Sequence, residues 1–340
     1  MEKGVKTVKV TLVLSIIAPV LFSVILVNAS NAETEFVGNF IYYVLHAETK
    51  AENIDDYLAF PLPMNYTDSL VKQKAFLEKL DGDFEVIKEG DSIVLGLPLN
   101  KTGGAKGTAF IVVYVAYNYT VIPKDEERYL KPTIPTLSDY APKSAIPRSL
   151  IEEYVGEPDE AIESMEDEVD QYLRQHGVDM NNVVEVAYWT AKYIMENFEY
   201  ETSGKPRMLS EVIATRKGDC DDLSEVFINL MWKFGIPAQL ERVGIFIWGE
   251  YKEIPLGASK IIYRNVGYHG YAVVYMPGWG WMPVDVTFNR DDNPFYGSRY
   301  FSKGVVMFDR VMERNVTAFE EFESFMESHE TVTEAVSYKH

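Results

Sequence analysis

The stretch that decides the fold lies past the middle of the chain: Arg216-Lys217-Gly218-Asp219-Cys220-Asp221-Asp222-Leu223-Ser224. The apolar residues that follow fall on one face of a helix: Leu223, Val226, Phe227, Leu230, Met231 and Phe234. Asp219 suits the N-cap, with Asp222 in a capping-box arrangement, and Gly235 ends the helix two residues before Pro237. The pattern predicts a buried helix that begins at the single cysteine of the sequence.

The position of Cys220 in the first helical turn favours a nucleophile. Free backbone amides and the positive end of the helix dipole stabilise a thiolate there and can hold an oxyanion. A lone cysteine is more commonly a small apolar core residue, but other side chains fill the apolar face here, and Gly218 leaves room for a substrate backbone. The neighbouring aspartates oppose ionisation of the thiol, so a base must lie close to it.

His269 is the candidate for that base among five histidines, which are His46, His176, His269, His329 and His340. It begins a strand that turns back through residues 276–280 into a second strand ending at Asp285. With this five-residue loop, His269 and Asp285 share a face of the hairpin one diagonal step apart, at roughly 7 to 8 Å. An imidazole and a carboxylate can bridge that distance, so Asp285 is the predicted orienting group.

The same residues resemble the transglutaminase-like superfamily, whose core holds a papain-like Cys-His-Asp triad. Four stretches carry the resemblance: Gly218-Asp219-Cys220, Phe234-Gly235-Ile236-Pro237-Ala238-Gln239, His269-Gly270-Tyr271 and Trp281-Met282-Pro283-Val284-Asp285-Val286-Thr287. They are similar to Gly-x-Cys, Gly-Ile-Pro-Ala-Arg, His-Ala-Trp and Trp-Val-Pro-x-Asp-x-Thr, over roughly residues 180–290. Gln239, Tyr271 and Val273 depart from the family pattern. More loosely, the N-terminal half is similar to secreted prokaryotic members.

The resemblance implies thiol acyl transfer by Cys220, His269 and Asp285 on peptide or glutamine amide bonds. A cysteine protease or amidase is favoured over a protein cross-linker. The backbone amide of Cys220 is the expected first oxyanion donor, and the second is left open between Trp189 and Tyr200. The alternative function is a non-catalytic cell-surface module that binds protein or glycan through exposed aromatic residues.

The predicted fold class is α+β, in which an N-terminal β-sandwich-like domain precedes a transglutaminase-like, papain-like α+β domain. Strand patterns dominate residues 33–130, and four prolines mark a linker at 131–148. The catalytic domain is expected at 149–310, with acidic helical sequence at 149–175 and an amphipathic helix at 182–198. An acidic C-terminal helix and tail are expected at 311–340.

The N-terminus has the pattern of an export signal. Residues 10–27 form an uncharged run of 18 after Lys3, Lys6 and Lys9, so residues 1–32 are a predicted signal peptide or membrane anchor. Five glycosylation sequons begin at Asn28, Asn65, Asn100, Asn118 and Asn315. We therefore expect an extracytoplasmic glycoprotein, secreted or held at the cell membrane by this segment.

The charge balance narrows the partners. There are 32 basic and 52 acidic residues, and the net charge of −20 would repel a nucleic-acid backbone. A protein or peptide substrate is expected instead. No cofactor or metal is predicted, because one cysteine cannot build a Cys-rich zinc site and residues 289–293 lack the spacing of an EF-hand.

Overall fold

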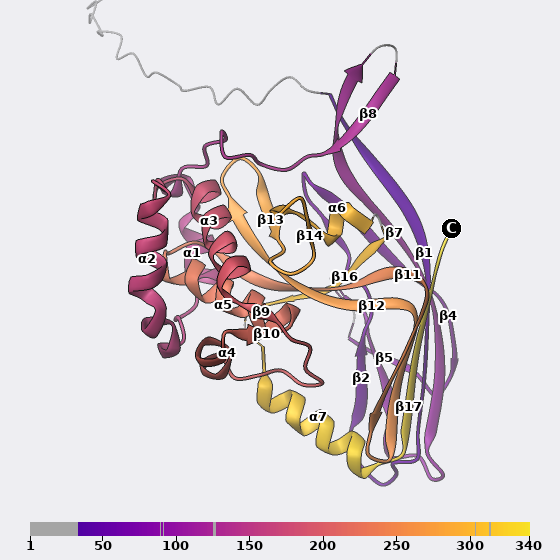
Figure 1. Cartoon of the computed structure of the whole chain (residues 1–340). Coiled ribbons are helices and arrows are strands. Elements are labelled where there is room, and N and C mark those ends of the chain that lie inside the picture. The colour runs from indigo at the N-terminus through magenta and orange to yellow at the C-terminus, as the bar shows by residue number, and fades with distance from the viewer. Residues whose placement is uncertain (1–32, 89, 91, 125–126, 303, 313) are drawn as a thin grey trace, which may run out of the picture. The chain divides into compact units, whose positions relative to one another are not determined.

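The computed structural model describes residues 33–88, 90, 92–124, 127–302, 304–312 and 314–340. The chain divides into two compact units, Met1–Asn31 and Ala32–His340. All that follows concerns the second unit, which contains both helices and long strands (Figure 1). The predicted α+β class is confirmed.

A ten-stranded sheet forms the frame of this unit, with the path β16-β11-β12-β17-β1-β7-β4-β3. Two further strands pair off this path, β13 with β12 and β8 with β7. The bounds are β1 Thr34–Thr49, β3 Tyr66–Thr67, β4 Val71–Gly82, β7 Ala105–Lys124, β8 Glu127–Pro132, β11 Ala238–Leu256, β12 Ser259–Met276, β13 Gly280–Val284, β16 Val305–Val311 and β17 Thr331–Lys339. Strands from both sides of the predicted linker at 131–148 thus share one sheet, and a domain boundary there stays a prediction.

Three small sheets complete the strands of the described residues: β2-β6-β5, β9-β10 and β14-β15. Their bounds are β2 Tyr57–Pro61, β5 Glu85–Lys88, β6 Val94–Pro98, β9 Glu199–Tyr200, β10 Lys217–Gly218, β14 Asn289–Arg290 and β15 Asn293–Gly297. Leu58, Leu95 and Leu97 of the first small sheet share a hydrophobic core with β1 and β7. The N-terminal strands therefore bury apolar side chains between two sheets, as in the expected sandwich.

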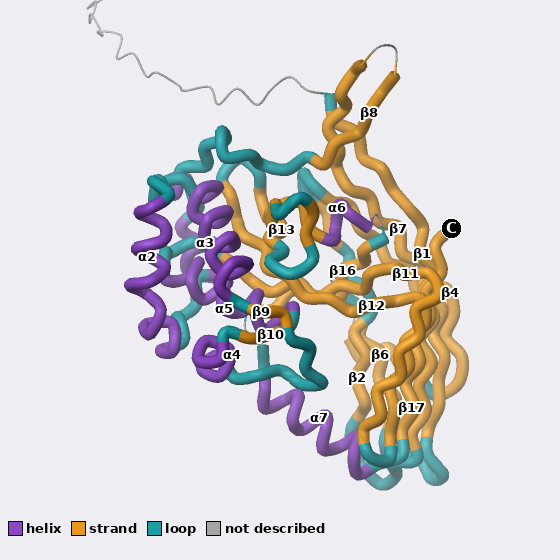
Figure 2. Tube along the Cα trace, viewed as in Figure 1, coloured by secondary structure: helices purple, strands orange, loops and turns teal. Residues whose placement is uncertain are grey.

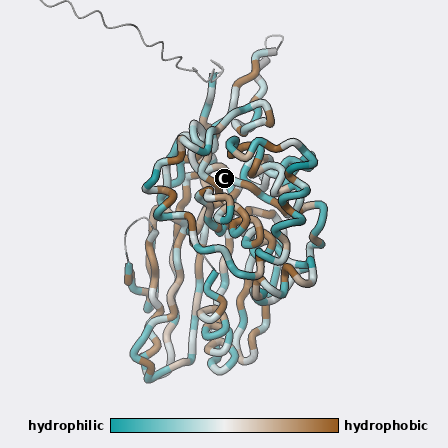
Figure 3. The backbone as a smooth tube through the Cα atoms, turned by 90° about the vertical axis from the view of Figure 1, so that its left-hand side faces the viewer, coloured by the Kyte–Doolittle hydropathy of each residue, from teal (hydrophilic) through white to brown (hydrophobic). Residues whose placement is uncertain are grey.

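Side chains alternate along the long strands, because successive residues of a strand point to opposite faces. Figure 3 shows hydrophobic and hydrophilic residues in alternation on these strands. In β17 the buried positions are Thr331, Thr333, Ala335 and Ser337. This strand is parallel to β12 and antiparallel to β1, so it joins the strands of the N-terminal region to those of the predicted catalytic domain.

Figure 2 shows the helices α2, α3 and α5 grouped together. Helix α3 contacts β12 and β13, α5 contacts β11 and β12, and α7 also contacts β11 and β12. The bounds are η1 Lys143–Ala145, α1 Arg148–Tyr154, η2 Glu160–Met165, α2 Glu166–Gln175, α3 Val183–Asn197, α4 Leu209–Thr215, α5 Cys220–Lys233, α6 Ser298–Ser302 and α7 Val316–Ser328. Helices α3 and α5 share a second core with the apolar faces of β12 and β13. This packing holds the start of α5 against β12.

The acidic segment 149–175 is not one continuous helix. Helix α1 ends at Tyr154, and a 3-10 turn and α2 follow after Gly156 and Pro158. Proline removes an amide donor and holds the residue before it extended. A side chain at position 156 would lie 2.8 Å from the Trp232 ring, so the chain passes close to α5 at this glycine.

The expected location needs correction. No helix within the described ranges has the length and apolar character to cross a membrane. The expectation of an extracytoplasmic protein, secreted or anchored by its N-terminal apolar segment, is therefore wrong on what the structure describes. The run at 10–27, predicted as signal peptide or anchor, and the sequon at Asn28 lie outside the described residues.

Candidate active site

Cys220 is the first residue of α5, as the capping pattern predicts. The Asp219 side chain accepts from the backbone amide of Asp222, and the Asp222 side chain accepts from the amide of Asp219 at 3.2 Å. Ser224 Oγ donates to the Cys220 carbonyl at 2.6 Å and lies 3.4 Å from the Gly270 carbonyl. These bonds fix Cys220, whose thiol is half-buried, at the start of the helix next to β12.

His269 on β12 and Asp285 at the end of β13 are paired. The register places Tyr275 opposite Trp281 and Ala272 opposite Val284, which is the hairpin expected from the sequence. His269 Nε2 lies 2.9 Å from Asp285 Oδ2, and the two side chains are only 9% and 1% exposed. An ion pair in this buried setting escapes most solvent screening.

The electrostatics of the pair favour an imidazolium next to a carboxylate. Burial by itself lowers the pKa of His269, but the Asp285 carboxylate, together with a hydrogen bond and charge interaction from Cys220, raises it to about 10. Burial opposes ionisation of Asp285, whereas the charge of His269 and backbone amides lower its pKa. Those amides belong to Phe288, at 2.8 Å from Oδ1, and Ser298, at 3.2 Å from Oδ2.

The structure thus brings Cys220, His269 and Asp285 together. Because Nε2 of the imidazole bonds to Asp285, Nδ1 is the nitrogen left for the thiol. Gly270 permits the approach of β12 to α5, since a Cβ at this position would lie 3.2 Å from the Asp221 side chain. The three groups form a connected line from a helix start to a buried carboxylate.

The aspartates around the thiol carry less net charge than their number suggests. Arg314 donates to Asp221 at 3.1 Å and to Asp222 at 2.7 Å, and Arg207 donates to Asp222 at 2.8 Å. Burial and the neighbouring Asp221 raise the pKa of Asp219, which disfavours its charged form. The expected opposition of these residues to a thiolate is therefore largely offset.

Asp219, Cys220 and Asp221 hold their ligand atoms within 4.8 Å of one another, which is close enough for a metal ion. The three are consecutive in sequence, and the guanidinium of Arg314 already pairs with Asp221. This arrangement is better explained as charge compensation beside the thiol than as a metal centre.

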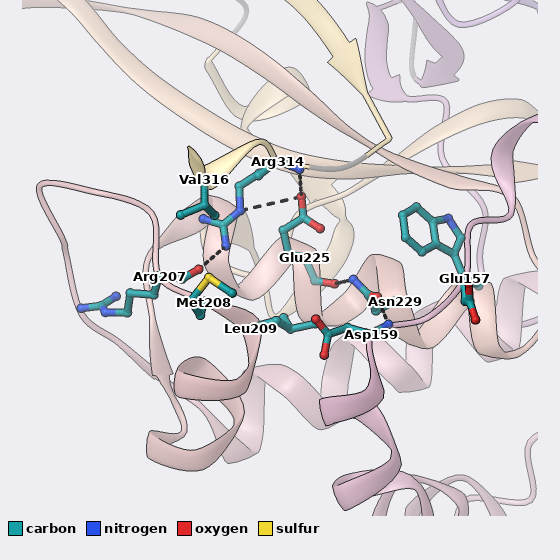
Figure 4. A pocket seen from close by; sticks show the side chains of 10 residues that line it. Glu157, Asp159, Arg207, Met208, Leu209, Glu225, Asn229, Arg314 and Val316 are labelled. Atoms are coloured by element: carbon teal, nitrogen blue, oxygen red, sulfur yellow. Dashed lines mark hydrogen bonds and ion pairs between the residues drawn. The ribbon is translucent and has the colours of Figure 1, made fainter. Parts of the chain in front are cut away.

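Arg207 and Arg314 border a cavity of about 220 Å³ on the side of α5, which Figure 4 shows. The backbone amide of Arg314 donates to Glu225 of α5, and its guanidinium donates to the Arg207 carbonyl at 3.1 Å. The segment before α4 is thereby tied to α5. Sequence reasoning missed both arginines. The acidic first turn of a buried helix signals that cations must be near, but it does not say which ones.

The two side-chain candidates for the second oxyanion donor have different surroundings. Trp189 stacks on His176, with ring centroids 4.1 Å apart, and packs beside Tyr172. Tyr200 lies on β9 beside Gly218 of β10. Burial raises the pKa of Tyr200 to about 12, and the charge of Cys220 adds to this effect. Tyr200 and His269 line the same pocket.

With this geometry established, residues 170–286 match the sequence profile of the Transglutaminase-like superfamily. The chain contains a transglutaminase-like domain. The matched transglutaminase-like segment includes Cys220, His269 and Asp285, and at the superfamily level it supports a papain-like thiol enzyme.

Two further comparisons accompany this match. A crystal structure described as "a Putative Cysteine Protease from Cytophaga hutchinsonii" is similar over 91% of this chain and 91% of its own, at 13% identity and a TM-score of 0.47. None of the curated proteins compared with this chain matches it in sequence.

Proposed function

We propose that the protein is a thiol acyl-transfer enzyme that cleaves peptide or other carboxamide bonds through Cys220, His269 and Asp285. The observation that carries the proposal is the connected arrangement of the three side chains at the start of α5, with His269 Nε2 2.9 Å from Asp285 Oδ2. The thiol serves as nucleophile, the imidazole as base and acid, and the carboxylate as the group that orients the imidazole.

In the first half-reaction the sulfur of Cys220 attacks the carbonyl carbon of the substrate while its proton resides on Nδ1 of His269. The carbon–nitrogen bond then breaks, and His269 returns this proton to the departing amine. The product is a thioester between the acyl group and Cys220. In the second half-reaction His269 takes a proton from water, the hydroxide oxygen attacks the thioester, and the thiol leaves with a proton from the imidazolium.

Two groups would stabilise the negative oxygen that forms during the attack. Backbone amides in the first turn of a helix have no carbonyl partner within the helix, and Cys220 occupies that turn. The Tyr200 hydroxyl is the proposed second donor, because Tyr200 lines the same pocket as His269 and the charge of Cys220 contributes to the raised pKa of its phenol. Each such donor contributes about 10²- to 10³-fold to the rate in comparable sites.

The first test measures alkylation of Cys220 by iodoacetamide at neutral pH, read by mass spectrometry. The native protein should react much faster than His269→Ala, because the variant lacks the base. His176→Ala is the matched control. The His176 ring stacks on Trp189 and not on a residue of the proposed triad, so this variant should react at the native rate. Equal and slow alkylation of all three proteins would overturn the proposal.

Hydrolysis is favoured over cross-linking, because water needs no binding site whereas amine transfer requires a site that holds an amine and keeps water away. Casein incubated with and without a primary amine separates the two reactions. Hydrolysis yields fragments in both samples, and transfer yields amine-labelled casein only when the amine is present. Labelled and uncleaved casein would reverse this assignment.

A further inference from the structure

A pocket of about 290 Å³ opens beside the imidazole of His269. Ile247 of β11 and Tyr268 of β12 line one part of it, and Phe288, which follows Asp285, lines another. Tyr200, the proposed oxyanion donor, also lines the pocket. The pocket therefore adjoins the proposed reaction centre through two groups that the mechanism uses.

The lining is apolar and well supported. His269 is the one ionisable residue apart from tyrosines among the described residues that line it. The hydroxyl of Tyr268 bonds to that of Tyr43 at 2.7 Å, so its polar end is satisfied and its ring forms the wall. Phe288 packs edge-on against His269, with ring centroids 5.9 Å apart, while its backbone amide holds Asp285. The wall is thus tied to the same carboxylate that orients the imidazole.

The side chains of this pocket still contact solvent. Ile247, Tyr268 and Phe288 are 41%, 44% and 39% exposed. Adjoining apolar residues that remain open to water are typical of a binding site. An occupant with an apolar surface would remove that area from water.

The mechanism determines which part of a substrate reaches this pocket. His269 must give its proton to the departing amine, so that amine lies next to the imidazole. The pocket is bounded by the same imidazole, whereas Cys220 does not line it. The side chain that enters is therefore that of the residue whose amine leaves.

On the basis of the proposed function, we infer that this pocket binds a large apolar side chain, aromatic or branched aliphatic, on the amine side of the scissile bond. A basic side chain would lose hydration here and would meet the imidazolium of His269 instead of an opposite charge. An acidic side chain would find the imidazolium of His269 already paired with Asp285 and would be repelled by the net charge of −20.

The experiment uses internally quenched peptides that differ at one position, which is Phe, Leu, Gly, Lys or Glu on the amine side of the cleaved bond. A second set carries the same changes on the carbonyl side. We expect kcat/KM to be about 10- to 100-fold higher for Phe or Leu than for Gly on the amine side. Lys and Glu should be no better than Gly. The carbonyl-side set should show a smaller range.

A variant pair tests the wall itself. Ile247→Ser should reduce the Phe-to-Gly ratio of kcat/KM, because it removes part of the apolar wall. Ile122→Ser is the matched control, because Ile122 is equally exposed at 41% but lies on β7 and does not line the pocket. A Phe-to-Gly ratio that survives Ile247→Ser, or a preference confined to the carbonyl side, would overturn the inference.

Alkylation of Cys220 by iodoacetamide, measured on the same samples, separates this inference from the proposed function. Slow alkylation that does not depend on His269 refutes the function. Fast alkylation without an amine-side preference refutes only the pocket assignment. If no quenched peptide is cleaved, the residues that follow each cut in casein are read by mass spectrometry. Cuts without apolar enrichment, or no cuts by a reactive thiol, count against the inference.

Discussion

Replacing Gly297 by alanine should displace Asp285 from the imidazole of His269. Gly297 ends β15, directly before the residue whose amide bonds to Asp285. An added Cβ would lie 2.4 Å from the Cβ of Asp285 and 3.1 Å from its Oδ2. Carbon atoms in contact normally stay about 3.5 to 4.0 Å apart, so one side must move by about 1 Å.

Two effects of different size follow from that movement. Overpacking of a buried site destabilises the fold by about 1–3 kcal/mol. A shift of about 1 Å in a group that positions the reaction can lower its rate by about 100-fold. We therefore expect a modest loss in the free energy of unfolding, measured by urea titration, and a much larger loss in the alkylation rate of Cys220.

Gly90→Ala is the control for this substitution, because an added Cβ at position 90 meets no atom within 4 Å. It should change the free energy of unfolding by less than about 0.5 kcal/mol and leave the alkylation rate unchanged. If Gly297→Ala lowers stability but not the rate, Asp285 does not position the imidazole. If it lowers neither, the site beside Asp285 accommodates the added Cβ and the expectation is refuted.

Three further outcomes are expected. Asp285→Asn removes the charge that raises the pKa of His269, so the alkylation rate at pH 7 should fall by about 10²- to 10⁴-fold, which a pH–rate profile measures. The raised pKa of His269, about 10, means that the folded state holds a proton that the unfolded state loses near pH 6.5. The stability that this proton contributes is full below about pH 6.5 and is lost as the pH rises towards 10. The difference in the free energy of unfolding between the native protein and His269→Gln, measured by urea titration, should therefore shrink over this range. A difference that grows would contradict the assignment. Arg314→Gln leaves Asp222 buried with one cation fewer and should destabilise by about 3–5 kcal/mol, whereas Arg148→Gln, which removes an exposed pair, should change urea stability little.

The sequence predicted those parts of the fold that local chemistry determines. The helix that begins at Cys220 depends on a capping box and an apolar face within a few residues. The hairpin that carries His269 and Asp285 follows from strand alternation and the loop length. The structure shows that these residues lie close together, and their catalytic role stays a prediction.

The buried positions of β4 do not read as an apolar alternation. Val71 and Ala75 are separated by Gln73, which is fully buried. The Gln73 amide donates to the Met64 and Met307 carbonyls and accepts from the Met307 amide. Met307 lies 234 residues away in the sequence, so only the folded chain shows why a glutamine belongs there.

A weak apolar pattern also explains why the strand at residues 331–339 was not predicted. Residues 331–339 were expected as a tail after a helix, yet they form a strand. Threonine, alanine and serine occupy its inward positions, and such small side chains give a weak hydropathy signal. The strand is specified by the two neighbours between which it lies, β12 and β1.

That strand has a consequence for how the protein is made. The ribosome delivers β1 first and β17 some 290 residues later, yet the two are adjacent in the finished sheet. Until residues 331–339 have emerged, β1 and β12 present unpaired edges, which are exposed to wrong partners. We expect nascent chains that stop before Thr331 to need chaperone protection and to leave Cys220 unreactive, so the reactive thiol would be assembled only after synthesis of this last strand.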